Sequence, residues 1–149
     1  MTDQPMAPQS PDDVDAILEF ARTIAVVGLT DRPARDDHEV ARYLQGQGLR
    51  VIPVNPRLTA PVLGERPYPD LASIPEPIDL VDVFRRPEFT DAHIDEAIAV
   101  GARAVWLQLG IRNPDGIARA RAAGLLAVQD RCLMVEHRRW RAGRARQPT

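Results

Sequence analysis

Short apolar segments alternate with segments of helical spacing along the middle of the chain, and this alternation most constrains the fold. Strands that alternate with helices are joined by right-handed crossovers, which build a parallel sheet covered by helices on both faces. The sequence therefore predicts an α/β, Rossmann-like, doubly wound sheet of five mainly parallel strands in the order 3-2-1-4-5. The predicted strands are 23–29, 51–54, 78–84, 104–109 and 125–128, and the predicted helices between them are 38–47, 90–100 and 114–123.

Proline interrupts the second predicted strand and dominates the segment that follows it. Pro53 lies inside strand 51–54, where a residue without a backbone N–H loses one ladder hydrogen bond. We therefore expect a bulge or weak pairing at Pro53. The proline-rich region 56–77 is expected to be mostly loop.

Charge divides the chain into three parts. The length of 149 residues fits a single domain, and the net charge of −2 hides an acidic beginning and an arginine-rich end. A helix start is predicted at Ser10 and Pro11, where a capping serine precedes a first-turn proline. We expect a disordered, acidic and proline-rich start at 1–10, one domain at 11–140 and a basic tail at 141–149.

Composition excludes several classes of site. All 19 basic residues are arginine, so the chain has no lysine for a Schiff base or a Walker-type phosphate loop. One cysteine and three histidines exclude a disulfide framework and a cysteine-rich zinc site, and no metal is expected. The slightly acidic balance argues against a nucleic-acid partner, and the lack of a long apolar run argues against a membrane span. A cytoplasmic location is expected, and homo-oligomer formation is left open.

Polar residues follow each predicted strand. In an open α/β sheet, the ligand lies beyond the carboxyl ends of the strands, near the switch in strand order. Four of the five segments that follow the strands contain arginine, whose guanidinium matches phosphate geometry. This coincidence predicts a polar, phosphate-bearing ligand. The five segments are 28–38, 55–57, 85–87, 108–110 and 129–132.

A nicotinamide cofactor fits these segments poorly. Its fingerprint needs three glycines after the first strand, and only Gly28 is present. The acidic residue that binds the ribose after the second strand is replaced by Asn55. Two interpretations of Gly28 remain open: it permits a tight turn, or it lets the backbone approach a phosphate.

Five short motifs in this order resemble the single-domain CoA-binding proteins. That family is related to the CoA-binding domain of succinyl-CoA synthetase and of ADP-forming acyl-CoA synthetases. The similarity extends from about Val14 to Trp140 and implies a Rossmann-like fold that binds coenzyme A at the carboxyl edge of the sheet. The motifs are IAVVGLT at 24–30, VIPVNP at 51–56, VDVFRRPE at 81–88, WLQLG at 106–110 and DRC at 130–132.

The resemblance also implies roles for individual positions. The loop after the first strand would approach the ligand, with an arginine paired to a phosphate. The residues after the second strand would shape the nucleotide pocket, and those after the third would lie near the phosphates or ribose. The residues after the fourth strand would line the pantetheine side. In chain order these positions are Gly28, Thr30 and Arg35, then Asn55 and Pro56, then Arg85, and finally Gln108 and Gly110.

The chain departs from its relatives after Arg35, where they typically carry proline and serine. Asp36 and Asp37 stand there instead. Asp37 is expected to cap the helix that begins at His38, as serine would. A carboxylate beside an anionic pyrophosphate is also expected to weaken binding.

Cys132 follows the last predicted strand at the expected ligand crevice. One interpretation is a thiol that meets the thiol end of CoA and forms a mixed disulfide under oxidation, with Arg131 favouring the thiolate. The other is a small buried hydrophobic residue. Both stay open at this stage.

No catalytic constellation stands out, because His93 is expected on a helix surface and His137 in a solvated basic end. The sequence thus predicts non-catalytic binding of coenzyme A or an acyl-CoA through arginine and backbone contacts to phosphates. One alternative is an enzyme, either a nicotinamide-type oxidoreductase or a Cys132-dependent acyl-CoA or redox enzyme. Another is an interaction subunit that uses its charged ends.

Overall fold

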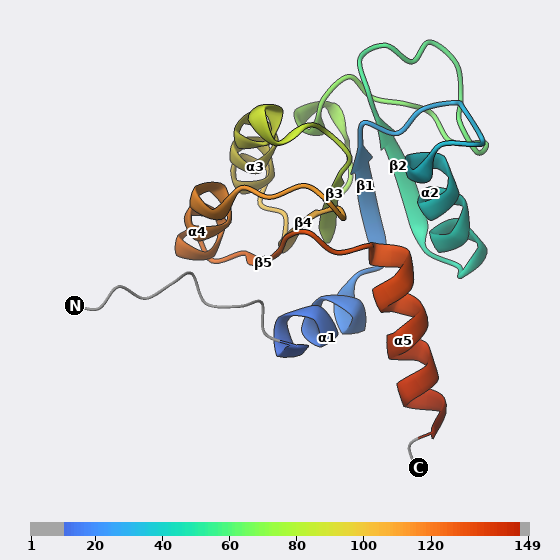
Figure 1. The fold of residues 1–149 in the computed structure, drawn as a ribbon. Coiled ribbons are helices and arrows are strands. Elements are labelled where there is room, and N and C mark those ends of the chain that lie inside the picture. The colour runs from blue at the N-terminus through green and yellow to red at the C-terminus, as the bar shows by residue number, and fades with distance from the viewer. Residues whose placement is uncertain (1–10, 147–149) are drawn as a thin grey trace.

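Five parallel strands form a central sheet with helices on both faces in the computed structural model, which describes residues 11–146 (Figure 1). One helical layer contains α1 (Pro11–Phe20), α2 (Asp36–Gly46) and α5 (Leu133–Arg146), and the other contains α3 (Thr90–Ala99) and α4 (Pro114–Ala122). Two short 3-10 helices are η1 (Leu71–Ser73) and η2 (Pro87–Phe89). The strands are β1 (Thr23–Val27), β2 (Arg50–Val54), β3 (Leu80–Val83), β4 (Ala104–Leu107) and β5 (Leu126–Val128).

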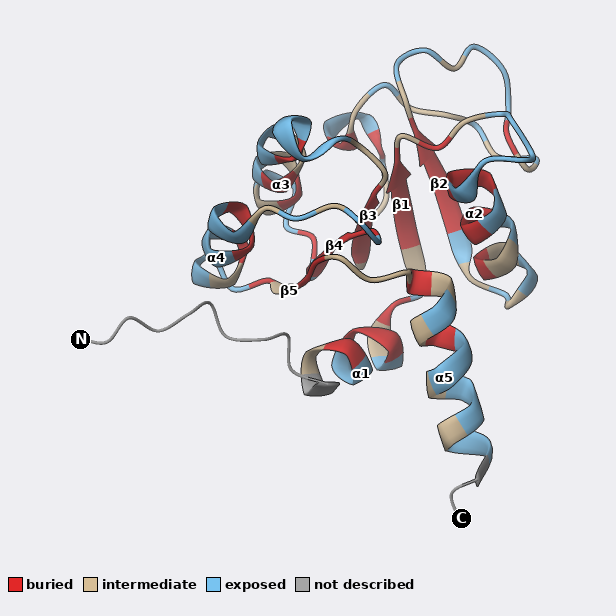
Figure 2. Ribbon diagram, viewed as in Figure 1, coloured by how far each residue is buried: buried red, intermediate tan, exposed pale blue. Residues whose placement is uncertain are grey.

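The strands are buried on both faces, as the continuous apolar runs predict (Figure 2). Side chains from alternate strand positions enter two separate cores. Ala25 and Val81 pack in the core under α3 and α4, whereas Val26 and Trp106 pack in the core under α1, α2 and α5. The predicted α/β, Rossmann-like fold is therefore confirmed.

The strand order is β2-β1-β3-β4-β5, so β1 pairs with β2 on one side and with β3 on the other. The order 3-2-1-4-5 expected from the sequence differs in one position, because it placed the third strand beside the second. The strand β2 lies on one side of β1, and the later strands β3, β4 and β5 are added on the other side. The switch in strand order therefore lies between β1 and β3. Ligands of such sheets bind beyond this point.

Pro53 explains why β2 lies at the edge. The register between β1 and β2 is continuous from Thr23 opposite Arg50 to Val27 opposite Val54, so the expected bulge at Pro53 is wrong. The carbonyl of Pro53 points away from β1 and accepts a hydrogen bond from the Tyr68 N–H at 3.0 Å. The missing N–H consequently faces the outer side of β2, where, within residues 11–146, no further strand pairs and Tyr68 forms an isolated bridge with Val54.

The other predicted strands and helices agree with the structure to within a few residues, but α5 was not predicted. The expected solvated position of His137 is wrong, because this side chain is buried within α5. The expected disordered start at 1–10, including the capping Ser10, lies outside the described residues. Helix α5 extends to Arg146, so the predicted basic tail at 141–149 begins inside this helix. Between residues 11 and 146, no helix has the length and apolar character needed to cross a membrane.

Candidate functional site

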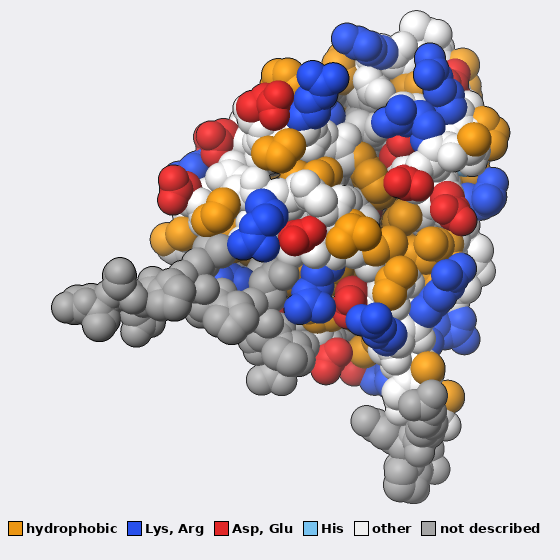
Figure 3. Space-filling model, in the orientation of Figure 1, with side chains coloured by type: hydrophobic (Ala, Val, Ile, Leu, Met, Phe, Trp, Pro, Cys, Tyr) orange, Lys and Arg blue, Asp and Glu red, His pale blue; other side chains and the backbone are white. Residues whose placement is uncertain are grey.

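A cleft of about 1070 Å³ opens at the carboxyl ends of β1, β2 and β3. Its walls come from the loop after β1, the start of α2, the loop after β2 and the segment that leads from β3 into α3. Arginine side chains gather at the top of the molecule, above the carboxyl ends of β1 and β2 (Figure 3). The lining includes six of the predicted contact residues, namely Gly28, Thr30, Arg35, Asn55, Pro56 and Arg85.

Gly28 is required by the backbone at this point. Its φ is +88°, and an added Cβ would lie 2.3 Å from the carbonyl oxygen of Phe84. Its N–H donates to the carbonyl of Val54 at 2.9 Å. Gly28 therefore lets the loop after β1 turn tightly against the end of β3, and this packing alone explains the glycine.

Asp37 organises the loop after β1 although its side chain is buried. Its Oδ2 accepts hydrogen bonds from the backbone N–H and the hydroxyl of Thr30, each at 2.7 Å, and its Oδ1 accepts one from Nε of Arg35 at 3.0 Å. The expected capping role of Asp37 is wrong, because α2 begins at Asp36 with Arg35 in the capping position. The carboxylate lies instead in the first helical turn, from which it reaches back to the loop.

Asn55 connects the loops after β1 and β2. Its side-chain N–H donates to the carbonyl of Leu29 at 3.1 Å, and its side-chain oxygen accepts from the N–H of Arg57 at 2.9 Å. Both ends of the amide are thus used to hold the two loops together beside Pro56.

The arginines of the cleft differ in their partners. Arg35 is bonded to Asp37, and its side chain is 58% exposed. Arg85 lies over the ring of Phe89, with its guanidinium carbon 4.8 Å from the ring centre. Within residues 13–145, no carboxylate pairs with the side chains of Arg57, Arg85 or Arg86, although all three line the cleft.

His93 and Glu96 also line the cleft, in contrast to the expected surface position of His93. The Nδ1 atom of His93 lies 2.9 Å from Oε1 of Glu96, and its Nε2 lies 3.5 Å from a terminal nitrogen of Arg85. The i, i+3 spacing of these two residues, in the first helix of full length after Arg85, was the sequence feature that could have identified them as cleft residues. A helix that begins at the carboxyl edge presents its first turns to the ligand side.

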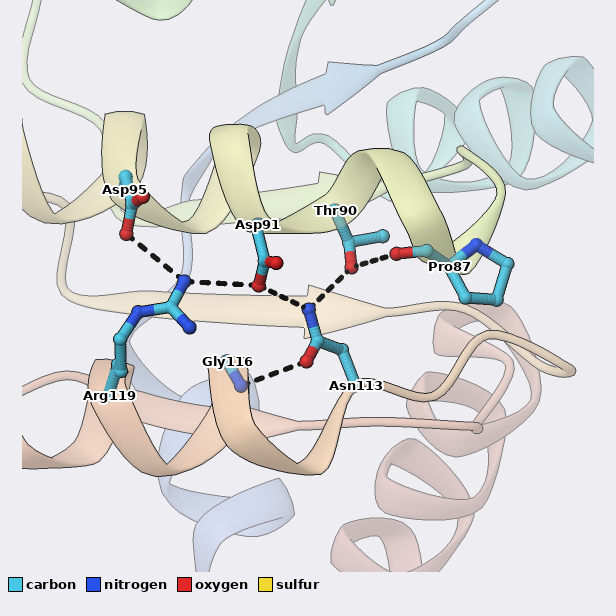
Figure 4. A network of polar contacts seen from close by, with 7 residues as sticks. All are labelled: Pro87, Thr90, Asp91, Asp95, Asn113, Gly116 and Arg119. Atoms are coloured by element: carbon cyan, nitrogen blue, oxygen red, sulfur yellow. Dashed lines mark hydrogen bonds and ion pairs between the residues drawn. The ribbon is translucent and has the colours of Figure 1, made fainter.

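A polar network fixes α3 against α4 on the opposite side of α3 (Figure 4). Asn113 donates to the hydroxyl oxygen of Thr90 at 2.9 Å and to Asp91 at 2.8 Å. Arg119 bridges Asp91 and Asp95 at 3.2 and 3.1 Å. The bonds from Asn113 and Arg119 lower the pKa of Asp91 below its ordinary value. This network joins α3 to α4, while Ile94 and Ala97 of α3 are buried in the core.

Comparison with known proteins identifies the family. Residues 22–138 match the family model described as "CoA binding domain". The chain belongs to this CoA-binding domain family.

Three relatives are similar over nearly their whole length. "Uncharacterized protein YneT" of Bacillus subtilis (strain 168) is 36% identical over 125 residues, which cover 84% of this chain and 92% of that protein. A solved structure from Thermus thermophilus is 44% identical with a TM-score of 0.83, covering 89% of this chain and 99% of that one. A hypothetical protein from Pyrococcus horikoshii OT3 is 37% identical with a TM-score of 0.84, covering 94% and 98%.

Three predicted contact residues of this CoA-binding domain do not line the cleft. Gln108 is buried, where its Nε2 donates to Asp82 at 2.6 Å and its Oε1 accepts from the N–H of Leu133 at 3.4 Å. The N–H of Gly110 donates to Asp130 at 2.7 Å. Cys132 is half-buried and packs against the core under α1, α2 and α5. Ligand contacts from these three residues stay predictions.

The CoA-binding domain also buries a carboxyl group that the sequence analysis missed. Asp82 lies in the central strand β3 and is fully buried. Burial raises the pKa of Asp82 to about 7, and the hydrogen bond from Gln108 opposes this shift. Its Oδ2 has no hydrogen-bond partner within the described part of the chain. The single charged position in the strand sequence LVDV was the available signal.

Proposed function

We propose that the chain binds coenzyme A or an acyl-CoA in the cleft and holds it without catalysing a reaction by itself. Membership of the CoA-binding domain family supports the ligand class. The observation that carries the proposal is a group of three cleft arginines, Arg57, Arg85 and Arg86, which pair with no carboxylate among the described side chains of residues 13–145.

These arginines differ from others in the same chain. Arg50 is paired with Glu65 and Glu76, and Arg119 is paired with Asp91 and Asp95. Like charges that gather in a cleft repel one another, and an anionic ligand relieves this repulsion. Guanidinium groups bind phosphate with two parallel hydrogen bonds. A ligand with several phosphates, such as CoA, therefore suits this arrangement.

The start of α2 contributes less to phosphate binding than a helix N-terminus ordinarily does. Asp36, Asp37 and Glu39 all lie in its first turn, and the first two line the cleft. Their negative charges offset the positive end of the helix dipole. The arginines on the loops after β2 and β3 are therefore assigned the main role in phosphate binding.

Two observations weigh against the enzyme alternatives. Asn55 uses both ends of its amide within the protein, and it offers no carboxylate to a cofactor ribose. Cys132 lies outside the lining of the cleft, which argues against attack of its thiol on a bound acyl-CoA.

Calorimetric titration of the full chain with CoA, acetyl-CoA and NAD tests the proposal. We expect saturable binding of CoA and acetyl-CoA, no binding of NAD, and no release of CoA from acetyl-CoA over time. Arg85→Gln should weaken CoA binding by about 10- to 100-fold, because a charge-assisted hydrogen bond contributes about 1.5–3 kcal/mol. The matched control is Arg42→Gln, which changes an exposed arginine of α2 outside the cleft.

Binding of NAD without binding of CoA would overturn the proposal in favour of a nicotinamide site. Turnover of acetyl-CoA that disappears in Cys132→Ser would overturn its non-catalytic part.

A further inference from the structure

Arg85, His93 and Glu96 form a linear polar chain on the β3–α3 wall of the cleft. Glu96 contacts Nδ1 of His93 at 2.9 Å, and Nε2 of His93 faces Arg85 at 3.5 Å. The side chain of His93 is 18% exposed, so the imidazole is largely enclosed but reaches the cleft. The cluster thus presents one guanidinium and one imidazole edge to the same ligand space.

The two neighbours of the His93 imidazole determine what each of its ring nitrogens can do. An ionised carboxylate only accepts hydrogen bonds, so Nδ1 of His93 carries the hydrogen that Glu96 accepts. A guanidinium only donates, so Arg85 can only offer a hydrogen to Nε2 of His93. The 3.5 Å separation from Arg85 is long for a hydrogen bond. Nε2 is therefore the imidazole atom left for a ligand in the cleft, and it lies beside the cation of Arg85.

We propose that Arg85 and His93 form a subsite for a phosphate monoester of the bound ligand, and that His93 takes up a proton when this group binds. This inference rests on the proposed CoA-binding function. The proton passes from solvent to Nε2, and the resulting N–H donates to a phosphate oxygen while Arg85 donates to another. Glu96 keeps its hydrogen bond to Nδ1 and balances the new imidazolium charge. No covalent bond forms or breaks at the phosphate.

A phosphate monoester suits this cluster better than a pyrophosphate diester does. A monoester has a second pKa near 6, carries close to two negative charges at neutral pH and exposes three acceptor oxygens. Each phosphate of a diester-linked pyrophosphate carries only one negative charge. Coenzyme A contains both groups, with its monoester on the ribose. Two cations that converge from Arg85 and His93 match the dianionic group.

Two charged groups face the His93 imidazole directly, and further charged groups lie on the elements packed around α3. Arg85 is the cation that faces Nε2, and Glu96 is the carboxylate that faces Nδ1. On the α4 side, Arg119 is engaged by Asp91 and Asp95. The charged residues on the other elements packed around α3 are Arg86 at the start of η2, Glu88 in η2, Asp82 in β3, and Asp115 and Arg121 in α4.

Calorimetry with CoA and with 3′-dephospho-CoA separates the monoester from the rest of the ligand. At about pH 7.5 the monoester is already dianionic, so proton uptake from the buffer reports on the protein. Titrations in two buffers of different ionisation enthalpy should show proton uptake with CoA and none with dephospho-CoA. CoA should also bind about tenfold more tightly than dephospho-CoA, as expected for added charge-assisted hydrogen bonds.

Variants assign the effect to this cluster. His93→Gln should abolish proton uptake and reduce the preference for CoA over dephospho-CoA. Glu96→Gln should reduce proton uptake while the imidazole of His93 is kept. This second variant tests the inference even if His93→Gln fails to fold. Arg57→Gln is the matched control in the cleft, and it should weaken both ligands alike while proton uptake persists.

CoA binding with equal affinity for the two ligands and no proton uptake would overturn this inference and leave the proposed function standing. Proton uptake that persists in His93→Gln would overturn it as well, because another group would then be titrating. Absence of any CoA binding would instead overturn the proposed function, and this inference with it.

Discussion

Replacement of Asp82 by asparagine removes a carboxyl group from the centre of the sheet while its shape is kept. Asp82 is fully buried, accepts one hydrogen bond from Gln108 and pairs with Trp106 across the strands. Asparagine retains an oxygen for Gln108 but cannot ionise. The change therefore tests whether the pKa of Asp82 is raised by burial.

The pKa shift determines the size and sign of the effect. Burial raises the pKa of Asp82 from an ordinary value of 3.8 to about 7. Unfolded chains therefore lose this proton at a lower pH than folded ones. The contribution of Asp82 to the free energy of unfolding is consequently complete below about pH 4 and falls as the pH rises to about 7. The difference corresponds to about 4 kcal/mol of unfolding free energy, from about 1.4 kcal/mol for each pH unit between the two values.

Urea unfolding followed by circular dichroism, at several pH values, measures this contribution. The wild type and Asp82→Asn should be about equally stable near pH 4, and near pH 8 the variant should be more stable by up to about 4 kcal/mol. The control Asp15→Asn makes the same chemical change at an exposed carboxylate of α1, and it separates the effect of burial from that of the substitution itself. A constant difference between the wild type and Asp82→Asn from pH 4 to pH 8 would refute the reasoning.

Three further predictions concern the loop after β1 and the contact between α2 and α5. Gly28→Ala should destabilise the protein by about 3 kcal/mol in thermal or urea unfolding, because a side chain meets both a positive φ and the Phe84 carbonyl; unchanged stability would contradict the described backbone. Asp37→Ser should weaken CoA binding in calorimetry and lower the melting temperature, since Thr30 and Arg35 lose a shared partner at a cost of about 1–3 kcal/mol; tighter binding would support the repulsion expected from the sequence. Burial, followed by the charge of Arg141, lowers the pKa of His137. The imidazole of His137 is hydrogen-bonded to the Tyr43 hydroxyl at 2.8 Å. The contribution of His137 to stability is therefore lost as the pH falls. His137→Gln should accordingly lose less stability than the wild type between neutral and acidic pH in thermal melts, and an equal loss would argue against this role.

The strands and the helices between them were predictable because each depends on a local pattern. Continuous apolar runs predicted the buried parallel strands, and helical spacing predicted the helices between them. Strand order depends on how distant segments pair, which periodicity does not contain. Pro53 held that information, because its missing N–H suits an edge strand, whereas the order 3-2-1-4-5 gave the second strand neighbours on both sides.

The candidate site was predictable in part for a related reason. Position after a strand places a residue at the carboxyl edge, and this brought Arg35, Asn55 and Arg85 to the cleft. It does not determine whether the side chain turns to the ligand or into the protein. Gln108 turns inward because Asp82, on the neighbouring strand, accepts its hydrogen bond. His93 faces the cleft because Ile94 and Ala97 take the core-facing positions of α3.

The two outer strands limit how this sheet grows. An unprotected edge strand serves as a template for a strand from another copy, which leads to aggregation or exchange of segments. Along β2, Pro53 offers no donor and its carbonyl is already bonded to Tyr68. At the other edge, β5 has three residues, and the carbonyl of Ala127 accepts a hydrogen bond from the Arg121 side chain at 2.9 Å. Contacts between copies are therefore expected to use the helices and loops, and the sheet itself ends within one chain.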